Sequence, residues 1–213
     1  MLQHDLLIPV LKELYKQGSG DFNKDFNLFA FRDEESSPTG DKLDDVLGFT
    51  VGNRCYLGIG TTDPGREATL KPLTVAGITG AARIKEGFQP EVYQIGVHAA
   101  SKPSFAHDAW IQTGILSIYR DTNKNGKGDE SDPVTRGWYG CNRHRASKTK
   151  LIEYIGPYSY GCMVYWNAKD LEAELKAFRE CPLGKKKGYL NGIMIVRDAE
   201  MTRKLVKFIK EGK

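Results

Sequence analysis

The sequence YGCNRHRASKTKLIEYIGPYSYGCMVYWNAKDLEAELK, residues 139–176, contains the strongest structural signals in this chain. Two short strands are predicted, one running into His144 and one following the glycine turn at Gly161, with a basic loop after the first. A helix is predicted over 168–180, because Asn167 is a good N-cap and Asp170 can complete a capping box. These elements indicate a β-rich domain with helices on its surface.

The flanking sequence extends the same pattern in both directions. Helices are predicted over 4–17 and 199–211, where apolar residues recur at helical spacing. Strands are predicted at 26–32 and 46–51, in an antiparallel meander between 75 and 119, and at 188–197. We therefore predict a mainly β (α+β) fold with three peripheral helices, in one domain spanning 1–213. Residues 1–20 are predicted to form an N-terminal helical appendage.

The composition argues against several classes of protein. The chain has 213 residues, 40% of them hydrophobic and 27% charged, which is typical of one globular domain. Its net charge of +4 is well below the lysine and arginine density of nucleic-acid-binding proteins, so we expect no nucleic-acid partner. No run of about 18 apolar residues is present, so we expect no membrane span. The four cysteines show no CxxC spacing and are expected to be free thiols.

The first residues, MLQHDLLIPVLKELYKQG, do not match a secretory signal. They lack a basic start, and Asp5 and Pro9 interrupt the apolar stretch. We therefore expect synthesis in the cytoplasm without a signal peptide. Action at the cell wall or in the periplasm then requires release or delivery in a virion.

Cys162 and His144 form the sharpest chemical pattern. A thiol with a pKa of about 8.5 needs a base before it can act as a nucleophile, and an imidazole one loop away can supply it. Gly161 allows a tight turn in which the N–H groups of Tyr160, Gly161 and Cys162 can face a developing oxyanion. The alternative interpretation is that Cys162 is a buried structural cysteine.

The segment NRHRA, followed after 14 residues from His144 by SYGCMVYWNAKDLEAEL, resembles the catalytic signature of the L,D-transpeptidase family. It is most similar to a divergent bacteriophage-encoded branch, whose members share four motifs in one order. These motifs are Thr61–Gly65 (TTDPG), Gly96–His98 (G-x-H), Arg120–Asn123 (R-D-x-N) and Ser159–Cys162 (S-x-G-C). Two positions depart from the family pattern: Tyr160 replaces a histidine, and Val164 replaces an arginine or asparagine that anchors the substrate.

The resemblance implies an L,D-transpeptidase-like β-sandwich or barrel and an acyl transfer on peptidoglycan stem peptides through a Cys162 thioester. His144 takes the thiol proton, or the two groups form a thiolate–imidazolium pair. An amine or water then resolves the thioester, and the sequence does not choose between them. Ser159 would brace the turn or hydrogen-bond the site, and the alternative is an ordinary loop hydroxyl. The expected substrate contacts are His98, Asn142, Arg145 and Tyr158, with Asn142 also placed to orient the imidazole.

The loop DTNKNGKGDESD at residues 121–132 matches the template of a calcium-binding loop. Oxygen ligands fall at Asp121, Asn123, Asn125, Asp129 and Asp132, with a backbone carbonyl at Lys127. Its role would be to stiffen a loop that ends shortly before His144. A solvated hairpin tip built on Asn-Gly is the alternative.

Three other functions stay open at this point. A zinc site from His98, His107, Asp108 and His144 is conceivable, although no HExxH spacing is present. A wall-binding or virion-associated module that keeps the fold without turnover is the main alternative, and nucleic-acid binding has only the net charge behind it. The expected protein is a monomeric cysteine enzyme that requires no cofactor for catalysis and carries at most a structural Ca²⁺ ion.

Overall fold

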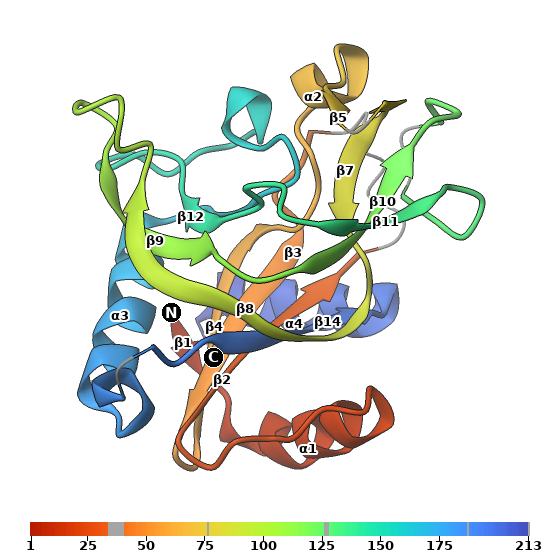
Figure 1. The fold of residues 1–213 in the computed structure, drawn as a ribbon. Helices are drawn as coiled ribbons and strands as arrows, with labels where there is room; N and C mark the ends of the chain where they lie inside the picture. Colours follow the sequence, from red (N-terminus) through yellow and green to blue (C-terminus); the bar gives the residue numbers. More distant parts are fainter. Residues whose placement is uncertain (34–40, 76, 126–127, 187, 213) are drawn as a thin grey trace.

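The computed structural model describes residues 1–33, 41–75, 77–125, 128–186 and 188–212. Eight strands form a closed barrel, in the order β4-β13-β12-β9-β8-β14-β2-β3, with β3 pairing back to β4 (Figure 1). Their bounds are β2 (Phe26–Arg32), β3 (Asp45–Val51), β4 (Arg54–Thr61), β8 (Gly87–His98), β9 (His107–Gln112), β12 (Arg143–Arg145), β13 (Met163–Tyr165) and β14 (Asn191–Arg197). A short strand, β1 (Leu2–Gln3), pairs antiparallel with Tyr56 and Leu57 of β4. The prediction of a mainly β fold is confirmed.

Strands β2, β3 and β13 are buried on both faces, which explains their nearly continuous apolar sequence, whereas β8 has several exposed residues. Every residue of β2, FNLFAFR, is buried. One apolar cluster contains Leu28, Trp110 and Met163, and a second contains Phe29, Val46 and Val164. Side chains of one strand alternate between these two clusters, as the period of a β-strand requires.

Helices cover the barrel from several sides: α1 (Ile8–Gln17), α2 (Arg66–Leu70), α3 (Ala168–Glu180) and α4 (Ala199–Glu211). Single turns of 3₁₀ helix occur at Asp5–Leu7, Gly156–Tyr158 and Leu183–Lys185. The prediction of three helices was wrong by one, because α2 is only five residues long and has no apolar periodicity. Helix α1 is packed on the barrel, where the Tyr15 hydroxyl donates to the carbonyl of Leu28 at 2.6 Å.

The predicted caps are correct in part. The side chains of Asn167 and Asp198 accept from the backbone N–H groups of Lys169 and Met201, which starts α3 and α4. The capping box at Asp170 was wrong: its carboxylate accepts from the amino group of Met1 at 2.5 Å. The tertiary contact therefore replaces the local one.

A smaller sheet lies beside the barrel, made of β7 (Ala81–Ile84), β10 (Leu116–Asp121) and β11 (Val134–Gly137). A separate two-stranded ladder joins β5 (Thr74–Val75) to β6 (Ile78–Thr79). The meander predicted for 75–119 is thus divided: β8 and β9 enter the barrel, whereas β7 and β10 pair with each other outside it. Among the described residues, none of the helices has the length and apolar character needed to cross a membrane.

A buried ion pair fixes the strand that carries His144. The guanidinium of Arg143 pairs with Glu174 of α3, and it also donates to the carbonyls of Phe29 and Gly48, each at 3.0 Å. The hydroxyl of Tyr165 and the indole N–H of Trp110 donate to the same carboxylate, at 2.6 and 2.8 Å. Strand β12 is therefore held to β2, β3, β13 and α3 at once.

Candidate active site

Strands β12 and β13 bring the His144 and Cys162 segments side by side. The two strands are parallel, with Arg143 opposite Met163 and His144 opposite Val164. The backbone N–H of Met163 donates to the carbonyl of Asn142 at 2.9 Å, so Cys162 lies next to Asn142. The sulfur and the imidazole belong to positions that are two residues apart across neighbouring strands, and no hydrogen bond joins them among the contacts of the described residues.

Cys162 differs from the other three cysteines in its accessibility. Cys55, Cys141 and Cys181 are buried, whereas Cys162 is partly exposed. Its Sγ lies 3.5 Å from the carbonyl oxygen of Gly140. Burial of the sulfur raises the pKa of Cys162 to about 11, although the backbone of Asn142 acts in the opposite direction. The resting group is therefore a thiol at neutral pH.

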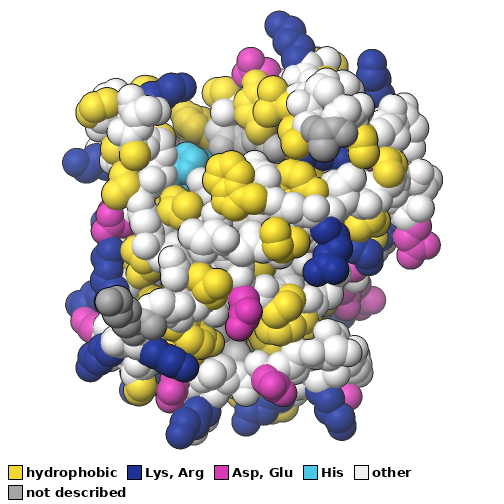
Figure 2. Space-filling model, viewed as in Figure 1, with side chains coloured by type: hydrophobic (Ala, Val, Ile, Leu, Met, Phe, Trp, Pro, Cys, Tyr) yellow, Lys and Arg dark blue, Asp and Glu magenta, His cyan; other side chains and the backbone are white. Residues whose placement is uncertain are grey.

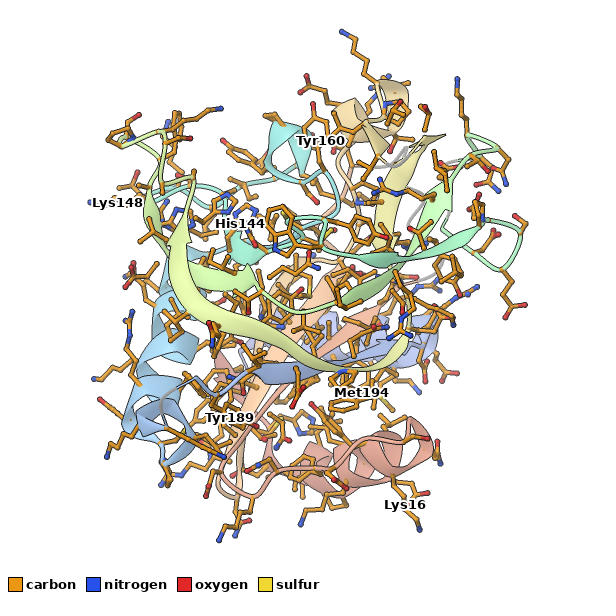
Figure 3. All side chains as sticks on the ribbon, in the orientation of Figure 1. Lys16, His144, Lys148, Tyr160, Tyr189 and Met194 are labelled. Carbon is orange, nitrogen blue, oxygen red and sulfur yellow. The ribbon has the colours of Figure 1, made fainter. Side chains whose placement is uncertain are left out.

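His144 is buried and held in one tautomer. Its Nδ1 donates to the carbonyl of Arg145 at 2.8 Å, which leaves Nε2 as the basic nitrogen, with no hydrogen-bond partner in the described part of the chain. The ring of His98 stacks on it with centroids 3.9 Å apart. Burial and the neighbouring His98 lower the pKa of His144 to about 3. The imidazole is thus neutral, and its Nε2 is enclosed by protein atoms near the backbone of Tyr158. Figure 3 places His144 on the upper part of the barrel, on the same side as Tyr160.

The glycine turn before Cys162 is held by the TTDPG segment. Gly161 has φ +121°, and a Cβ atom there would lie 2.8 Å from that of Ala82, so only glycine fits. The Ser159 Oγ lies 2.9 Å from the carbonyl of Asp63 and 2.7 Å from that of Cys162, and it accepts from the N–H of Gly161. The N–H of Gly65 donates to the carbonyl of Ser159 at 2.8 Å. Two sequence motifs about 100 residues apart therefore form one structure.

The structure leaves fewer oxyanion donors in this turn than the three N–H groups that were predicted. The Gly161 N–H is engaged by Ser159, so the N–H groups of Tyr160 and Cys162 are those without a partner among the described hydrogen bonds. The side chain of Tyr160 is 37% exposed and that of Val164 is fully buried. Val164 packs in the second apolar cluster and does not face a substrate.

Gln112 is a positioning residue that the sequence did not reveal. Its fully buried side chain accepts from the N–H groups of Tyr139 and Cys141 at 3.1 and 3.0 Å, and donates to the carbonyls of Gly114 and Gly137. It therefore holds the loop whose Gly140 carbonyl faces the sulfur. A lone glutamine on a strand has no motif that would distinguish it from a surface residue.

The four predicted substrate contacts lie close to His144. The backbone N–H of Gln112 donates to Oδ1 of Asn142 at 2.9 Å, so the amide nitrogen of Asn142 faces Nδ1 of His98 at 3.0 Å. Asn142 therefore orients His98, and the carbonyl of Arg145 orients His144. His98, Arg145 and Tyr158 line one pocket with His144, and Cys162 is not among its lining residues.

His107 joins the same group of rings. Its centroid lies 5.3 Å from that of His98 and 6.0 Å from that of His144. Asp108 turns away and pairs with Arg179 of α3 at 2.5 Å. No group of three or more histidine, cysteine or acidic side chains in the described residues is arranged to hold a metal ion. The geometry therefore gives no support to the zinc alternative.

The predicted calcium loop follows β10, and Lys127 lies outside the described residues. The carboxylates of the loop accept from its own backbone: Asp121 from the N–H of Asn125 at 3.1 Å, and Asp132 from that of Thr122 at 3.1 Å. Asn123 also accepts from Asn125, at 2.8 Å. Burial, followed by the nearby Asp121 and Asp129, raises the pKa of Asp132. The acidic groups therefore shape the loop, and in the part of the chain that the structure describes they do not form a group arranged to hold a metal ion.

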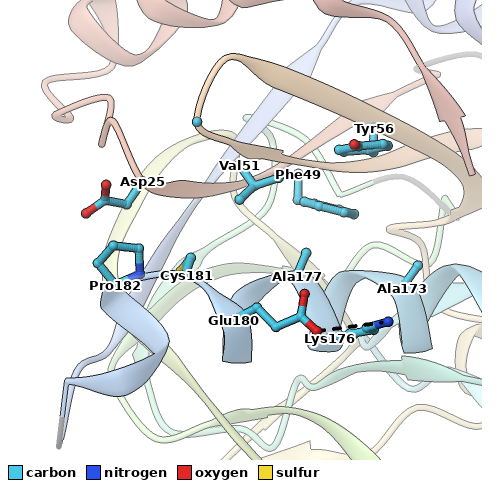
Figure 4. Close-up of a pocket in the computed structure, with 11 residues that line it drawn as sticks. Asp25, Phe49, Val51, Tyr56, Ala173, Lys176, Ala177, Glu180, Cys181 and Pro182 are labelled. Atoms are coloured by element: carbon cyan, nitrogen blue, oxygen red, sulfur yellow. Dashed lines mark ion pairs between the residues drawn. The ribbon is translucent and has the colours of Figure 1, made fainter.

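Two hollows differ in character. The larger, of about 590 Å³, lies between α3 and the β3–β4 hairpin and is lined mainly by apolar groups such as Phe49, Tyr56 and Ala177 (Figure 4). The second, of about 310 Å³, opens beside His144. Figure 2 shows a histidine in a depression flanked by hydrophobic side chains on the face seen in Figure 1.

Comparison with known proteins finds no match to this chain among protein-family models, curated proteins or solved structures.

Proposed function

We propose that the protein is a cysteine-dependent acyltransferase or peptidase of peptidoglycan stem peptides, with an L,D-transpeptidase-like fold and Cys162 as nucleophile. The observation that carries this proposal is the position of Cys162. Among the four cysteines it is the one with accessible surface, it directly precedes β13, and β13 runs parallel to the strand that carries His144. Ser159 and Gly161 hold it in a turn where the N–H groups of Tyr160 and Cys162 have no partner among the hydrogen bonds of the described residues, and such groups can bind an oxyanion.

The raised pKa of Cys162 and the lowered pKa of His144 favour one of the two proton arrangements. A neutral thiol and a neutral imidazole form the resting state, and the thiol proton moves to Nε2 of His144 as the sulfur attacks the substrate carbonyl. The C–S bond forms, the proton passes to the leaving amine, and the C–N bond breaks. Water or an acceptor amine then attacks the thioester and restores the thiol.

The transfer requires the imidazole and the sulfur to approach. Two residues of offset on neighbouring strands correspond to about 7–8 Å between the Cβ atoms. A bound carbonyl group can bridge this gap, or a rotamer change can shorten it.

The protein acts as a monomer without a required cofactor. We place its action at the cell wall or in the periplasm, reached by release or by delivery in a virion.

A second candidate is a non-catalytic wall-binding or virion-associated module. It is favoured by the high pKa of Cys162 and by the missing hydrogen bond between sulfur and imidazole. It would keep the barrel and use the exposed groups around His144 for binding alone.

Mass analysis of muropeptides separates the two candidates. Purified muropeptides incubated with the wild type are expected to change mass by loss of a residue or by cross-linking. Cys162→Ala is expected to abolish the change, while Cys181→Ala, at a buried cysteine in the other apolar cluster, serves as the matched control. No conversion by the wild type would favour the binding module, whereas conversion by Cys162→Ala would contradict the assignment of Cys162 as the nucleophile.

A further inference from the structure

Strand β7 of the smaller sheet contacts the turn that holds the candidate nucleophile. A Cβ atom at Gly161 would lie 2.8 Å from that of Ala82, so the strand and the turn are in direct contact. The next residue, Arg83, is only 5% exposed and directs its guanidinium at Asp63 of the TTDPG segment. Its Nε donates to Oδ1 of Asp63 at 2.6 Å, and Nη2 lies 2.6 Å from the same oxygen. Strand β7 therefore contacts both the turn and the segment that holds it.

Asp63 connects this ion pair to Cys162. Its carboxylate is buried against Arg83, and its backbone carbonyl lies 2.9 Å from Oγ of Ser159. The same hydroxyl lies 2.7 Å from the carbonyl of Cys162. Because the carboxylate and the carbonyl belong to one residue, a displacement of the ion pair displaces the contact with Ser159. Two residues thus separate the guanidinium of Arg83 from the nucleophile.

A second arginine nearby does not replace Arg83. Nε of Arg32 is 3.9 Å from the carboxylate of Asp63, which is too long for a hydrogen bond. That nitrogen donates instead to Oγ1 of Thr62 at 2.7 Å, and Nη2 of Arg32 donates to the carbonyl of Ile84 at 2.9 Å. Arg32 is therefore held by other partners, and the close hydrogen-bonded cation of Asp63 is Arg83.

The side chain of Arg83 is covered by the connection between β10 and β11. Gly128 is buried in this connection, and a Cβ atom on it would lie 2.7 Å from both Cβ and Cδ of Arg83. Such distances are shorter than side chains tolerate, so glycine is what lets the backbone lie directly on the arginine. Strand β10 also pairs with β7, with Tyr119 opposite Arg83. The position of the guanidinium therefore depends on the connection as well as on Asp63.

We propose that Arg83 is a positioning residue for Cys162, and that the β10–β11 connection acts on the nucleophile through it. The inference rests on the proposed function, since it concerns the control of the same thiol. A shift at Gly128 displaces the guanidinium, Asp63 follows, and Ser159 changes the direction of the two turn N–H groups that have no other partner. These groups bind the oxyanion, so the chemical step slows while binding of the substrate is retained.

The first test measures acylation of Cys162 by a carbapenem over a range of concentrations, which gives the limiting rate and the half-saturating concentration separately. Arg83→Gln should lower the limiting rate about tenfold and leave the half-saturating concentration unchanged. Arg83→Lys keeps the charge and should recover most of the rate. Arg136→Gln, at an exposed arginine of β11 in the same sheet, should match the wild type. An Arg83→Gln protein acylated as fast as the wild type would overturn the inference.

A second variant, Gly128→Ala, tests the connection with every hydrogen-bonding group of the ion pair retained. It should also lower the limiting rate, because the added methyl group displaces the side chain of Arg83. The double variant Gly128→Ala, Arg83→Gln should be no slower than the slower single variant, since both changes break the same link. An unchanged rate in Gly128→Ala, or effects that add in the double variant, would show that the connection does not act through Arg83.

Amide hydrogen exchange separates failure of this inference from failure of the proposed function, because it needs no reaction. The N–H of Gly161 donates to Oγ of Ser159, and that of Gly65 donates to the Ser159 carbonyl. In Arg83→Gln both should exchange faster than in the wild type, while the N–H groups of β3 keep their rates. Faster exchange at the turn without acylation of the wild type would sustain the link and refute the enzyme. Acylation of the wild type with unchanged exchange in Arg83→Gln would refute the link.

Discussion

His144 and Cys162 are both uncharged at neutral pH, because burial disfavours the imidazolium and the thiolate more than the nearby backbone dipoles favour them. The motif was enough to predict that these two residues belong to one site. Their protonation was not, since it depends on the His98 ring stacked on His144 and on the Gly140–Asn142 loop beside the sulfur. Gln112, which holds that loop, was missed for the same reason.

The buried imidazole makes stability depend on pH. His144 has a pKa of about 3 in the folded protein and about 6.5 when unfolded, so between these values the unfolded chain binds the extra proton. The free energy of unfolding should therefore fall as the pH falls from 6.5 toward 3, by up to about 1.4 kcal/mol per pH unit from this residue. His144→Gln should show a shallower decline in urea titrations at pH 7, 6, 5 and 4. Parallel curves for the two proteins would contradict the assignment.

Ser159 offers a test of the turn. Its hydroxyl is buried and bridges two carbonyls and one N–H group, so removing it leaves these groups unpaired. Ser159→Ala should lower the free energy of unfolding by about 1–3 kcal/mol, measured by urea denaturation. Ser104→Ala, at an exposed serine, is the control and should stay within about 0.5 kcal/mol of the wild type. A Ser159 variant as stable as this control would show that the turn does not depend on the hydroxyl.

At the scale of single elements, the position of strand β12 depends on the buried ion pair between Arg143 and Glu174. Arg143→Met leaves Glu174 buried without its partner and should destabilise the fold by about 3–5 kcal/mol. The double variant Arg143→Met, Glu174→Leu should recover much of this loss, because no unpaired charge stays buried. Chemical denaturation of the three proteins measures both effects. A double variant no more stable than the single one would contradict this account.

Calcium binding by the loop at 121–132 stays a prediction. A calcium concentration 100 times the Kd would add about 2.7 kcal/mol, which for a chain of this size corresponds to roughly 5–10 °C in Tm. We expect Tm to fall by this amount when a chelator replaces calcium chloride. Asp121→Asn should reduce the difference. An identical Tm with calcium and with chelator would show that the carboxylates serve the backbone alone.

At the scale of the whole molecule, the strand content and the long helices were predictable, because apolar period and caps are local. The resemblance named a sandwich or a barrel without choosing between them, and local pattern could not decide, since it does not determine that β4 pairs with both β3 and β13. The division of the 75–119 region had the same cause: β8 and β10 have similar alternation but join different sheets. The positions of His98 and His107 beside His144 follow from that long-range pairing.

Trapping of the acyl-enzyme tests the central claim most directly. The wild type is incubated with a carbapenem, which acylates nucleophilic thiols, and intact mass and peptide mapping locate the adduct. We predict one covalent adduct, on Cys162, formed more slowly by His144→Gln and absent from Cys162→Ala. An adduct that persists in Cys162→Ala, or a wild type that forms none, would contradict the assignment of Cys162 as the nucleophile.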